Sequence, residues 1–365
     1  MATDKQTPLR VLIAGGGTGG HIIPALAIAR VLKEQYGAEV RFVGTARGLE
    51  TRLVPQAGYK LELVKVGQLK NVSLETKIRT MLDLPLSLFT CIGLLMRFRP
   101  QVVVGVGGYA SGPAMGAAIL WGTPTLAFEP NAAPGLANRI IGRFVSAAAV
   151  NFAPAAAHFR KAEVTGIPVR AEFFSVPGPG VDHAPHLLVF GGSQGARILN
   201  ELMPKIVAHL LAAVPGLTIL HQAGARHAES TQSAYLLSGA DTSRWQVSEF
   251  LDDMASQFGR ANLVLARSGA STVAELAAAG KPSLLIPFAA AADDHQRRNA
   301  EVLATAGAAE MILESEATPD RVAEALVGLL HDQECLHRMS VAARGLAHRD
   351  AAERIAAQVV ELSRK

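Results

Sequence analysis

The chain has 365 residues, of which 49% are hydrophobic and 18% are charged, a composition that excludes a disordered chain and favours buried parallel sheets. A chain of this length more often forms two domains than one. Its net charge of +4 is unevenly distributed: residues 1–165 hold 18 Lys and Arg against 9 Asp and Glu, a net of +9, and residues 166–365 have a net of −5.

The basic first half indicates an anionic partner. We expect no nucleic acid, because only 5% of residues are aromatic and no dense Lys/Arg stripe or nucleic-acid motif is present. An anionic membrane surface is the better candidate, although the longest strongly apolar stretch, residues 84–96, is too short to span a bilayer. Cys91 and Cys335 have no metal-like spacing and the polar N-terminus has no signal-peptide pattern, so we expect a reduced, cytoplasmic compartment.

The first predicted strand runs directly into a glycine loop. Residues 11–14 are apolar, residues 15–20 read Gly-Gly-Gly-Thr-Gly-Gly, His21 follows, and Pro24 lies in the first helical turn. Such a connection gathers backbone N–H groups, so we expect it to bind a phosphate or another polar ligand. Three of its glycines also match the dinucleotide fingerprint, but the strand at 39–43 is not followed by the carboxylate that an NAD site needs. A nicotinamide cofactor is therefore a weaker interpretation of this loop than a phosphate or another polar ligand.

A basic amphipathic helix is predicted from about residue 71. Its apolar face holds Leu74, Ile78, Met81 and Leu82, and the basic residues near that face are Lys70, Lys77 and Arg79. Core packing and contact with a membrane surface are equally good interpretations of this helix. A second apolar segment follows Pro85, and we interpret it as a core helix.

Strands and helices alternate in both halves, which predicts two parallel sheets covered on both faces. Expected strands in the first half are residues 10–14, 39–43, 102–105, 125–128 and 147–150. Expected strands in the second half are residues 187–190, 218–222, 246–247, 263–265 and 283–286. The junction is expected near residues 166–168, with the Pro-Gly-Pro-Gly sequence at 177–180 as a stiff loop.

The second half contains two more glycine-containing connections. Residues 191–195, Gly-Gly-Ser-Gln-Gly, follow an apolar strand as the first loop does. Residues 267–275 follow the strand at 263–265 and open a helix, so the N–H groups of Ser271 and Thr272 could bind a phosphate. Glu275, one turn further on, could accept both hydroxyls of a ribose. An ordinary helix start with an acidic residue in its first turn explains this last pattern equally well.

Several motifs together resemble the MurG family of bacterial glycosyltransferases. The motifs are His21 after its glycine loop, Gly105-Val106-Gly107-Gly108-Tyr109-Ala110-Ser111-Gly112-Pro113, Gly191-Gly192-Ser193-Gln194-Gly195-Ala196-Arg197, Arg267-Ser268-Gly269-Ala270 and Asp294-His295-Gln296. The resemblance covers essentially the whole chain. It implies transfer of N-acetylglucosamine from its UDP donor to lipid I, giving lipid II for peptidoglycan.

The resemblance also implies an architecture and partners. The fold would be two Rossmann-like α/β domains facing across a cleft, the GT-B fold: residues 1–165 for the acceptor and the membrane, residues 166–345 for the UDP-sugar, and residues 346–365 as a helix that packs back on the N-terminal domain. The protein would lie peripherally on the cytoplasmic face of the inner membrane, with other cell-wall synthesis proteins as candidate partners. No cofactor or metal is expected.

The site residues that the resemblance implies divide into two groups. His21 and Glu129 are candidates for the catalytic base. The substrate-binding positions are Thr18, Gly19, Gly20, Asn131, Arg170, Ser193, Leu251, Ala270, Ser271, Thr272, Val273, Ala274, Glu275 and Gln296. Leu251 would contact the uracil through its backbone, and Asn131 and Gln296 would contact the sugar.

One segment departs from the family pattern. The family usually has His-Glu-Gln-Asn where this chain has Phe128-Glu129-Pro130-Asn131. Phe128 cannot exchange protons and Pro130 has no N–H to donate, so no family role passes to those two positions. The alternatives to a lipid II-forming transferase are another GT-B enzyme of UDP-sugars, such as an epimerase or a glycolipid synthase, and a two-lobed solute-binding protein, which the absent signal peptide disfavours.

Overall fold

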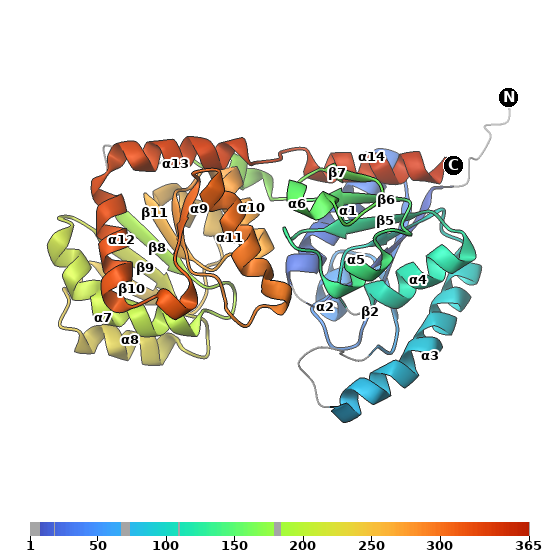
Figure 1. The fold of residues 1–365 in the computed structure, drawn as a ribbon, viewed down its shortest axis with the longest axis horizontal. Helices are drawn as coiled ribbons and strands as arrows, with labels where there is room; N and C mark the ends of the chain where they lie inside the picture. The colour runs from blue at the N-terminus through green and yellow to red at the C-terminus, as the bar shows by residue number, and fades with distance from the viewer. Residues whose placement is uncertain (1–7, 18, 67–73, 109, 179–183, 365) are drawn as a thin grey trace. The chain divides into compact units, whose positions relative to one another are not determined.

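The computed structural model describes residues 8–17, 19–66, 74–108, 110–178 and 184–364, without the side chains of residues 74–84 and 292. The chain forms two compact units. Unit 1 comprises residues 1–168 and 350–365, and unit 2 comprises residues 169–349. Figure 1 labels the elements of both units. Thr18, Tyr109, Lys70 and residues 179–180 of the expected stiff loop lie outside the described residues.

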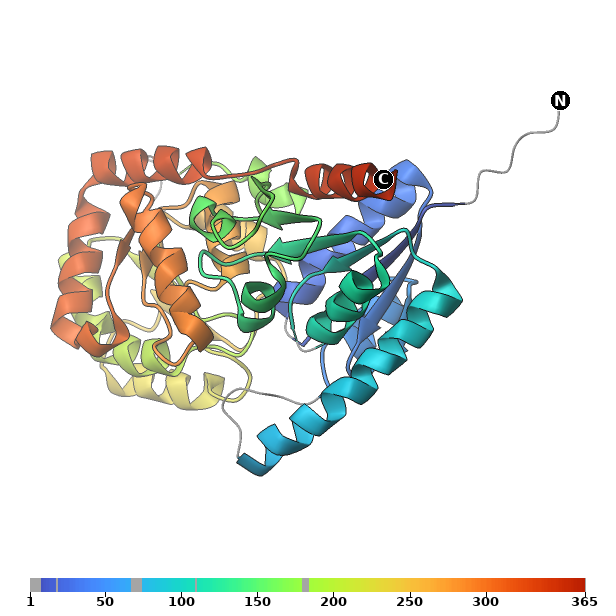
Figure 2. The ribbon, with the colours of Figure 1, turned by 45° about the vertical axis from the view of Figure 1, so that its right-hand side comes forward.

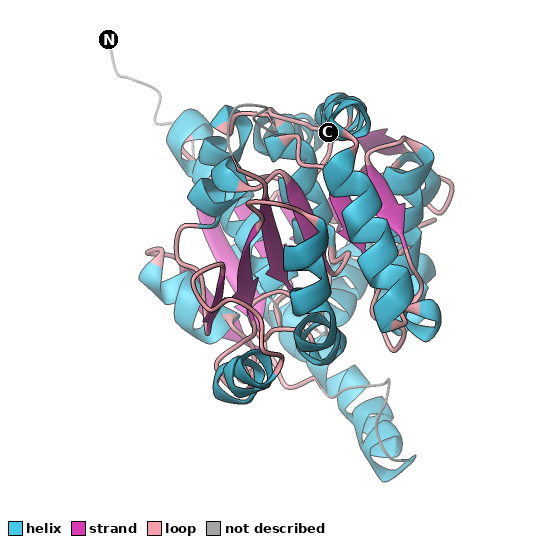
Figure 3. Cartoon of the chain, turned by 90° about the vertical axis from the view of Figure 1, so that its left-hand side faces the viewer, coloured by secondary structure: helices cyan, strands magenta, loops and turns pink. Residues whose placement is uncertain are grey.

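Unit 1 is built on a seven-stranded parallel sheet. Its strands are β1 (Arg10–Ala14), β2 (Glu39–Gly44), β3 (Lys60–Leu63), β4 (Val102–Gly105), β5 (Thr125–Glu129), β6 (Ala147–Val150) and β7 (Ala162–Val164). Their order in space is β3-β2-β1-β4-β5-β6-β7. The central strands β1, β4 and β5 are almost wholly buried, because helices cover the sheet on both faces (Figure 3).

The helices of unit 1 divide between the two faces of its sheet. They are α1 (Gly19–Tyr36), α2 (Glu50–Gln56), α3 (Leu74–Phe98), α4 (Ser111–Trp121), α5 (Leu136–Ile141), α6 (Ala153–Ala156) and the C-terminal α14 (Ala351–Ser363). Helix α14 packs against α1, whereas α3 packs against α4. Helix α3 continues through Pro85 as a single helix, and its N-terminal half projects beyond the sheet of unit 1 (Figure 2).

The C-terminal half of α3 is only partly the core helix that its sequence predicts. One face, including Cys91, Leu94, Leu95 and Phe98, is buried in a core cluster with Met115 of α4. The opposite face leaves apolar side chains exposed. They are Leu86, Phe89 and Met96. The side chains of the predicted face at Leu74, Ile78, Met81 and Leu82, and those of Lys77 and Arg79, lie outside the described part of α3.

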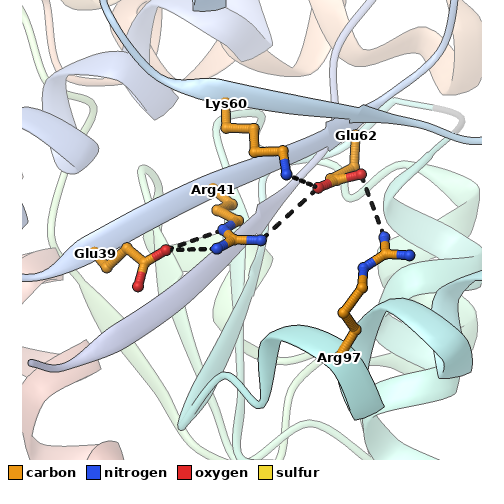
Figure 4. A network of polar contacts seen from close by, with 5 residues as sticks. All are labelled: Glu39, Arg41, Lys60, Glu62 and Arg97. Carbon is orange, nitrogen blue, oxygen red and sulfur yellow. Dashed lines mark hydrogen bonds and ion pairs between the residues drawn. The ribbon is translucent and has the colours of Figure 1, made fainter. Parts of the chain in front are cut away.

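Charged residues cover the β3 edge of this sheet (Figure 4). Arg41 of β2 pairs with Glu39 at 2.7 Å, and Glu62 of β3 pairs with Lys60 at 3.1 Å and with Arg97 of α3 at 3.4 Å. Side chains of this kind disfavour pairing with another strand at an open edge. They also connect β3 to α3.

Unit 2 has a six-stranded parallel sheet in the order β10-β9-β8-β11-β12-β13. Its strands are β8 (His186–Phe190), β9 (Thr218–Gln222), β10 (Trp245–Ser248), β11 (Leu263–Ala266), β12 (Ser283–Leu285) and β13 (Ala309–Met311). Its helices are η1 (Ala171–Ser175), α7 (Arg197–Ala213), α8 (Ala228–Leu237), α9 (Met254–Arg260), α10 (Ala270–Ala279), η2 (Ala292–Asp294), α11 (His295–Thr305), η3 (Glu314–Glu316), α12 (Pro319–His331) and α13 (Gln333–Gly345). Helices α7 and α12 share one core cluster with β8 and β11, while α10 packs against α11, α13 and η1.

The prediction of two parallel α/β sheets is confirmed, and each of the ten expected strands is present within one or two residues. Three strands were missed: β3, β7 and β13. All three are short edge strands with partly exposed side chains, so they lack the buried apolar run on which the prediction rests. No helix in the described residues is long and apolar enough to cross a bilayer.

Candidate active site

Each sheet has a topological switch point, where the strand order reverses. In unit 1 it lies between β1 and β4, and in unit 2 between β8 and β11. In open parallel sheets, ligands bind beyond the carboxyl ends of the strands at this point. Some of the predicted site residues follow these strands: His21 follows β1, Ser193 follows β8, and residues 270–275 follow β11. Each unit therefore has one position suited to a ligand.

In unit 1, two glycine loops meet at the switch point. The N–H of Gly16 donates to the carbonyl of Gly107 at 3.3 Å, and a Cβ atom on Gly15 or Gly108 would overlap the backbone of the facing loop. The imidazole of His21 lies against the same loop, because a Cβ on Gly107 would lie 2.8 Å from its Cε1 atom. The helix start therefore places His21 beside the β4 connection.

The expectation that the first loop offers its N–H groups to a phosphate is wrong for its three leading glycines. The Gly15 N–H donates to Val43 at 3.0 Å and the Gly16 N–H to Gly107. The Gly17 N–H donates to Glu50 Oε2 at 2.7 Å. These N–H groups are therefore engaged within the chain.

Sequence reasoning missed Glu50, which is 1% exposed. Its Oε1 accepts from the N–H of Thr45 at 3.0 Å and from the Thr45 hydroxyl at 2.9 Å. Burial by itself would raise the pKa of this carboxyl, but the hydrogen bonds from Gly17, Thr45 and its own N–H hold the pKa below its usual value. Gly44 and Gly48, on either side of Thr45, leave room for this carboxylate, since a side chain at either glycine would overlap that of Glu50; only the folded chain shows this relation.

Glu129, the last residue of β5, is 2% exposed and accepts four hydrogen bonds. Its Oε1 accepts from the N–H and the side-chain Nδ2 of Asn131, at 3.0 and 3.1 Å. Its Oε2 accepts from the N–H of Gly135 at 3.1 Å and from Asn138 Nδ2 at 2.9 Å. Burial raises the pKa of the Glu129 carboxyl, and these donors oppose the rise. The carboxylate thus connects β5 to the loop that carries Asn131.

In unit 2, helix α10 begins without a side-chain cap. Within the described part of the chain, no hydrogen bond engages the N–H groups of Ala270, Ser271 or Thr272, as is usual for the first turn of a helix. Val273 is buried, whereas Ala274 and Glu275 are partly exposed. The positive end of the helix dipole lies here, so this helix start is suited to an anion.

Glu275 and Arg170 lie close enough to interact electrostatically. Burial raises the pKa of Glu275 to about 7, while the charge of Arg170 lowers it and that of Glu172 raises it. Arg170 is half exposed, pairs with Glu172 at 2.9 Å and lies over the ring of Phe173 at 5.0 Å. Segment η1, which follows Arg170, packs against α10. The structure thus brings Arg170, from the segment before η1, close to the Glu275 carboxylate of α10.

Ser193 and Leu251 lie on two other connections of unit 2. Ser193 is exposed in the β8–α7 connection, which turns tightly against the β9 connection, since a Cβ on Gly195 would overlap the carbonyl of Ala223. Leu251 lies between β10 and α9, whose N-cap Asp253 accepts from Ser256 at 3.0 Å. Among the described residues, no hydrogen bond uses the backbone N–H or C=O of Leu251.

Gln296 is oriented by a hydrogen-bond network that sequence reasoning did not find. Its Oε1 accepts from the N–H of Phe288 at 3.0 Å, so its Nε2 group is the part that can donate to a ligand. Its carbonyl accepts from Ser268 Oγ at 2.8 Å. Buried Arg267 donates to the carbonyl of Ile286 and to Glu314 Oε2, at 3.0 and 2.8 Å. The start of α11, the β12 connection and the β11 connection are thereby held together.

Comparison with known proteins agrees with this architecture. The glycosyltransferase family 28 N-terminal domain matches residues 11–150, and the glycosyltransferase family 28 C-terminal domain matches residues 186–355. The chain therefore belongs to glycosyltransferase family 28.

Individual relatives match along almost the whole chain. One is the UDP-N-acetylglucosamine–N-acetylmuramyl-(pentapeptide) pyrophosphoryl-undecaprenol N-acetylglucosamine transferase of Solibacter usitatus, 42% identical over 99% of this chain and 98% of that protein. The protein of the same name from Myxococcus xanthus is 42% identical over 97% of this chain and 93% of its own. The crystal structure of Acinetobacter baumannii MurG is 31% identical, with a TM-score of 0.80 over 97% of this chain and 100% of that chain.

Proposed function

We propose that this protein transfers N-acetylglucosamine from UDP-N-acetylglucosamine to the C4 hydroxyl of N-acetylmuramic acid in lipid I, giving lipid II for peptidoglycan. The observation that carries the proposal is 42% identity, over almost the full length of both chains, to a transferase named for these substrates. An epimerase or glycolipid synthase of the same fold has no comparable support.

The donor is assigned to unit 2. The N–H groups at the start of α10, with Arg170, bind the diphosphate, and the Glu275 carboxylate accepts hydrogen bonds from the ribose hydroxyls. The backbone of Leu251 pairs with the uracil, Ser193 contacts the donor beside the diphosphate, and the Nε2 group of Gln296 donates to the sugar. The support is that Ser193, Leu251, the start of α10 and Gln296 follow strands β8, β10, β11 and β12 of one sheet, and that η1, which follows Arg170, packs against α10.

The base and the sugar-facing groups are assigned to unit 1. His21 is the proposed base, since histidine is the side chain that most often acts as a general acid or base. Glu129 is assigned a positioning role, because all four of its hydrogen bonds come from N–H donors and almost none of it is exposed. It holds the loop of Asn131, which contacts the sugar. Thr18, Gly19 and Gly20 are assigned to the loop that faces the donor sugar and diphosphate.

The reaction is a single in-line displacement with inversion. His21 removes the proton of the acceptor C4 hydroxyl as its oxygen attacks the anomeric carbon of the donor sugar. The bond from that carbon to the β-phosphate oxygen breaks, and UDP leaves with the electron pair. The α10 N–H groups and Arg170 stabilise the charge that develops on the diphosphate.

The test is incubation of the purified protein with labelled UDP-N-acetylglucosamine and a lipid I analogue. We expect release of UDP and a product with a new β(1→4) disaccharide. Interconversion of the UDP-sugar without a new glycosidic bond would identify an epimerase instead. Binding of the sugar nucleotide with no turnover, with or without acceptor, would favour a solute-binding protein.

We also propose that unit 1 binds peripherally to the cytoplasmic face of the inner membrane, where the lipid acceptor lies and where other cell-wall synthesis proteins are candidate partners. Helix α4 packs against both α3 and α5, and large apolar side chains are exposed on these three helices and just after α5. They are Leu86, Phe89, Met96, Leu120, Trp121, Ile140 and Phe144. The net charge of +9 in residues 1–165 complements anionic lipids.

Vesicle binding tests this location. A Phe89→Glu/Phe144→Glu variant should bind anionic vesicles at least tenfold more weakly, because burial of each aromatic ring contributes about 1.5–3 kcal/mol. The matched control is Leu236→Glu/Leu237→Glu on α8 of unit 2, where both leucines are exposed, and it should bind like wild type. Wild-type binding should also fall as salt rises. An equal loss of vesicle binding in the Phe89→Glu/Phe144→Glu variant and in the control variant would contradict the proposed membrane-binding face. A charge reversal at Lys70, Lys77 and Arg79 tests the amphipathic segment separately.

A further inference from the structure

The buried carboxylate of Glu50 sits at the centre of the first glycine loop. It comes from the first residue of α2 and joins Gly17, before α1, to Thr45, after β2. Three N–H or O–H donors from these two residues converge on it, at 2.7, 3.0 and 2.9 Å. Charge-assisted hydrogen bonds of this kind are roughly twice as strong as neutral ones.

The surrounding glycines leave room for this carboxylate. A Cβ atom at Gly16, Gly44 or Gly48 would overlap the Glu50 side chain. Gly16 also donates to Gly107, whose Cα lies against the His21 imidazole. The Glu50 carboxylate accepts a hydrogen bond from the N–H of Gly17, and Gly17 lies just before the start of α1, the helix that carries His21. Glu50 is therefore connected to His21 through this short segment of backbone.

We propose that Glu50 is a positioning residue for the transfer reaction: its carboxylate occupies the place that an anion takes in a phosphate-binding glycine loop and so holds the loop that orients His21. The inference rests on the proposed function. It also assigns a specificity role to this carboxylate, because the Gly17 N–H that it occupies does not bind the diphosphate of the nucleotide.

The experiment compares Glu50→Ala, Glu50→Gln and Thr45→Val with wild type. Turnover of a lipid I analogue and UDP affinity by calorimetry are measured well below each variant's Tm. The matched control is Glu62→Gln, which removes a carboxylate from the ion-pair network at the edge of the same sheet (Figure 4), outside the hydrogen bonds that Glu50 accepts.

We expect kcat to fall about a hundredfold in Glu50→Ala, as misplacement of a reacting group by about 1 Å does. Glu50→Gln, which keeps one acceptor oxygen, should recover part of this loss, and Thr45→Val should lower kcat about fivefold through one lost hydrogen bond. UDP affinity should stay at the wild-type value in every variant, and Glu62→Gln should keep its kcat.

Three outcomes would overturn the inference: wild-type kcat in the folded Glu50 variants, an equal loss in Glu62→Gln, or a parallel loss of UDP affinity. Where Glu50→Ala does not fold, Glu50→Gln and Thr45→Val decide the question. An inactive wild-type protein would instead contradict the proposed function, so the two failures are distinguishable.

Discussion

The first glycine loop of unit 1 and the start of α10 in unit 2 use their backbone N–H groups in opposite ways. In unit 1 the N–H groups of Gly15, Gly16 and Gly17 donate within the chain, and the last of them binds the carboxylate of Glu50. In unit 2 the N–H groups at the start of α10 have no partner among the described residues. A glycine loop after a strand is therefore not sufficient evidence for a phosphate site, because an internal anion can occupy it.

Glu50 of unit 1 and Glu275 of unit 2 also differ in whether donors within the chain offset the burial of the carboxylate. Glu50 accepts N–H and O–H donors, which lower its pKa despite burial. Glu275 has only the nearby charge of Arg170 to offset its burial, and its pKa rises to about 7. A carboxyl group with a raised pKa beside an open helix start is poised to gain hydrogen bonds from a ligand. We therefore expect substitutions in unit 1 to change turnover and substitutions in unit 2 to change donor affinity.

The largest expected effect is that of His21→Ala. It should lower turnover by roughly a hundredfold or more, since general-base catalysis contributes about 10²–10⁴-fold, and leave the donor Kd almost unchanged. Steady-state kinetics and UDP calorimetry on the same preparation measure both quantities. Near-normal turnover would make His21 a structural residue and return Glu129 to consideration as the base.

Glu275→Ala should have the next largest effect, and this effect should be on donor affinity, the property assigned to unit 2. Loss of hydrogen bonds to a charged group should weaken donor binding by about 1–3 kcal/mol. Calorimetry with UDP measures the change, and circular dichroism checks that the variant is folded. Unchanged affinity in the folded variant would remove Glu275 from the donor site.

A smaller effect is expected from pH. Because Glu275 has a pKa of about 7 in the free protein and binds the ribose as a carboxylate, affinity for UDP-N-acetylglucosamine should fall about tenfold from pH 8 to pH 6. This ligand has no terminal phosphate that titrates near neutral pH. The Glu275→Gln variant should bind UDP-N-acetylglucosamine more weakly than wild type, and its affinity should not change between pH 6 and pH 8. If its affinity still changed with pH as in wild type, the titrating group would be another residue.

The same pKa has a consequence for stability. A carboxyl group whose folded pKa lies above its unfolded value stabilises the fold at low pH, and this contribution is lost as pH rises through about 7. At pH 8, Glu275→Gln should therefore be more stable than wild type by about 1 kcal/mol. The gain should disappear below the ordinary carboxyl pKa of 4.5. Thermal melts at the two pH values measure it, and a loss of Tm at pH 8 would contradict the assigned pKa direction.

The sequence predicted the buried parts of the fold well and the contacts between loops poorly. Strands such as β1, β4 and β8 are continuous apolar runs, so their pattern alone identifies them. The edge strands β3, β7 and β13 depend on pairing with a neighbour, which no local pattern records.

In the candidate site, too, the contacts between segments far apart in the sequence could not be predicted. Ser271, Thr272 and Glu275 could be proposed from sequence because they belong to one helix start, and their positions follow from helix geometry. Glu50 could not, because its partner Gly17 lies 33 residues away and the contact forms only when α2 packs beside the first loop. The Arg267–Glu314 pair, 47 residues apart, was missed for the same reason.

The most direct test of the division between the two units is the amide NMR spectrum of the isotopically labelled protein titrated with UDP. We predict large shifts for the amides of Ala270, Ser271 and Thr272 and for that of Leu251, with those of Gly15, Gly16 and Gly17 almost unmoved. Large shifts at the three glycines with the start of α10 unchanged would contradict the account, because the nucleotide would then bind at the loop that Glu50 occupies.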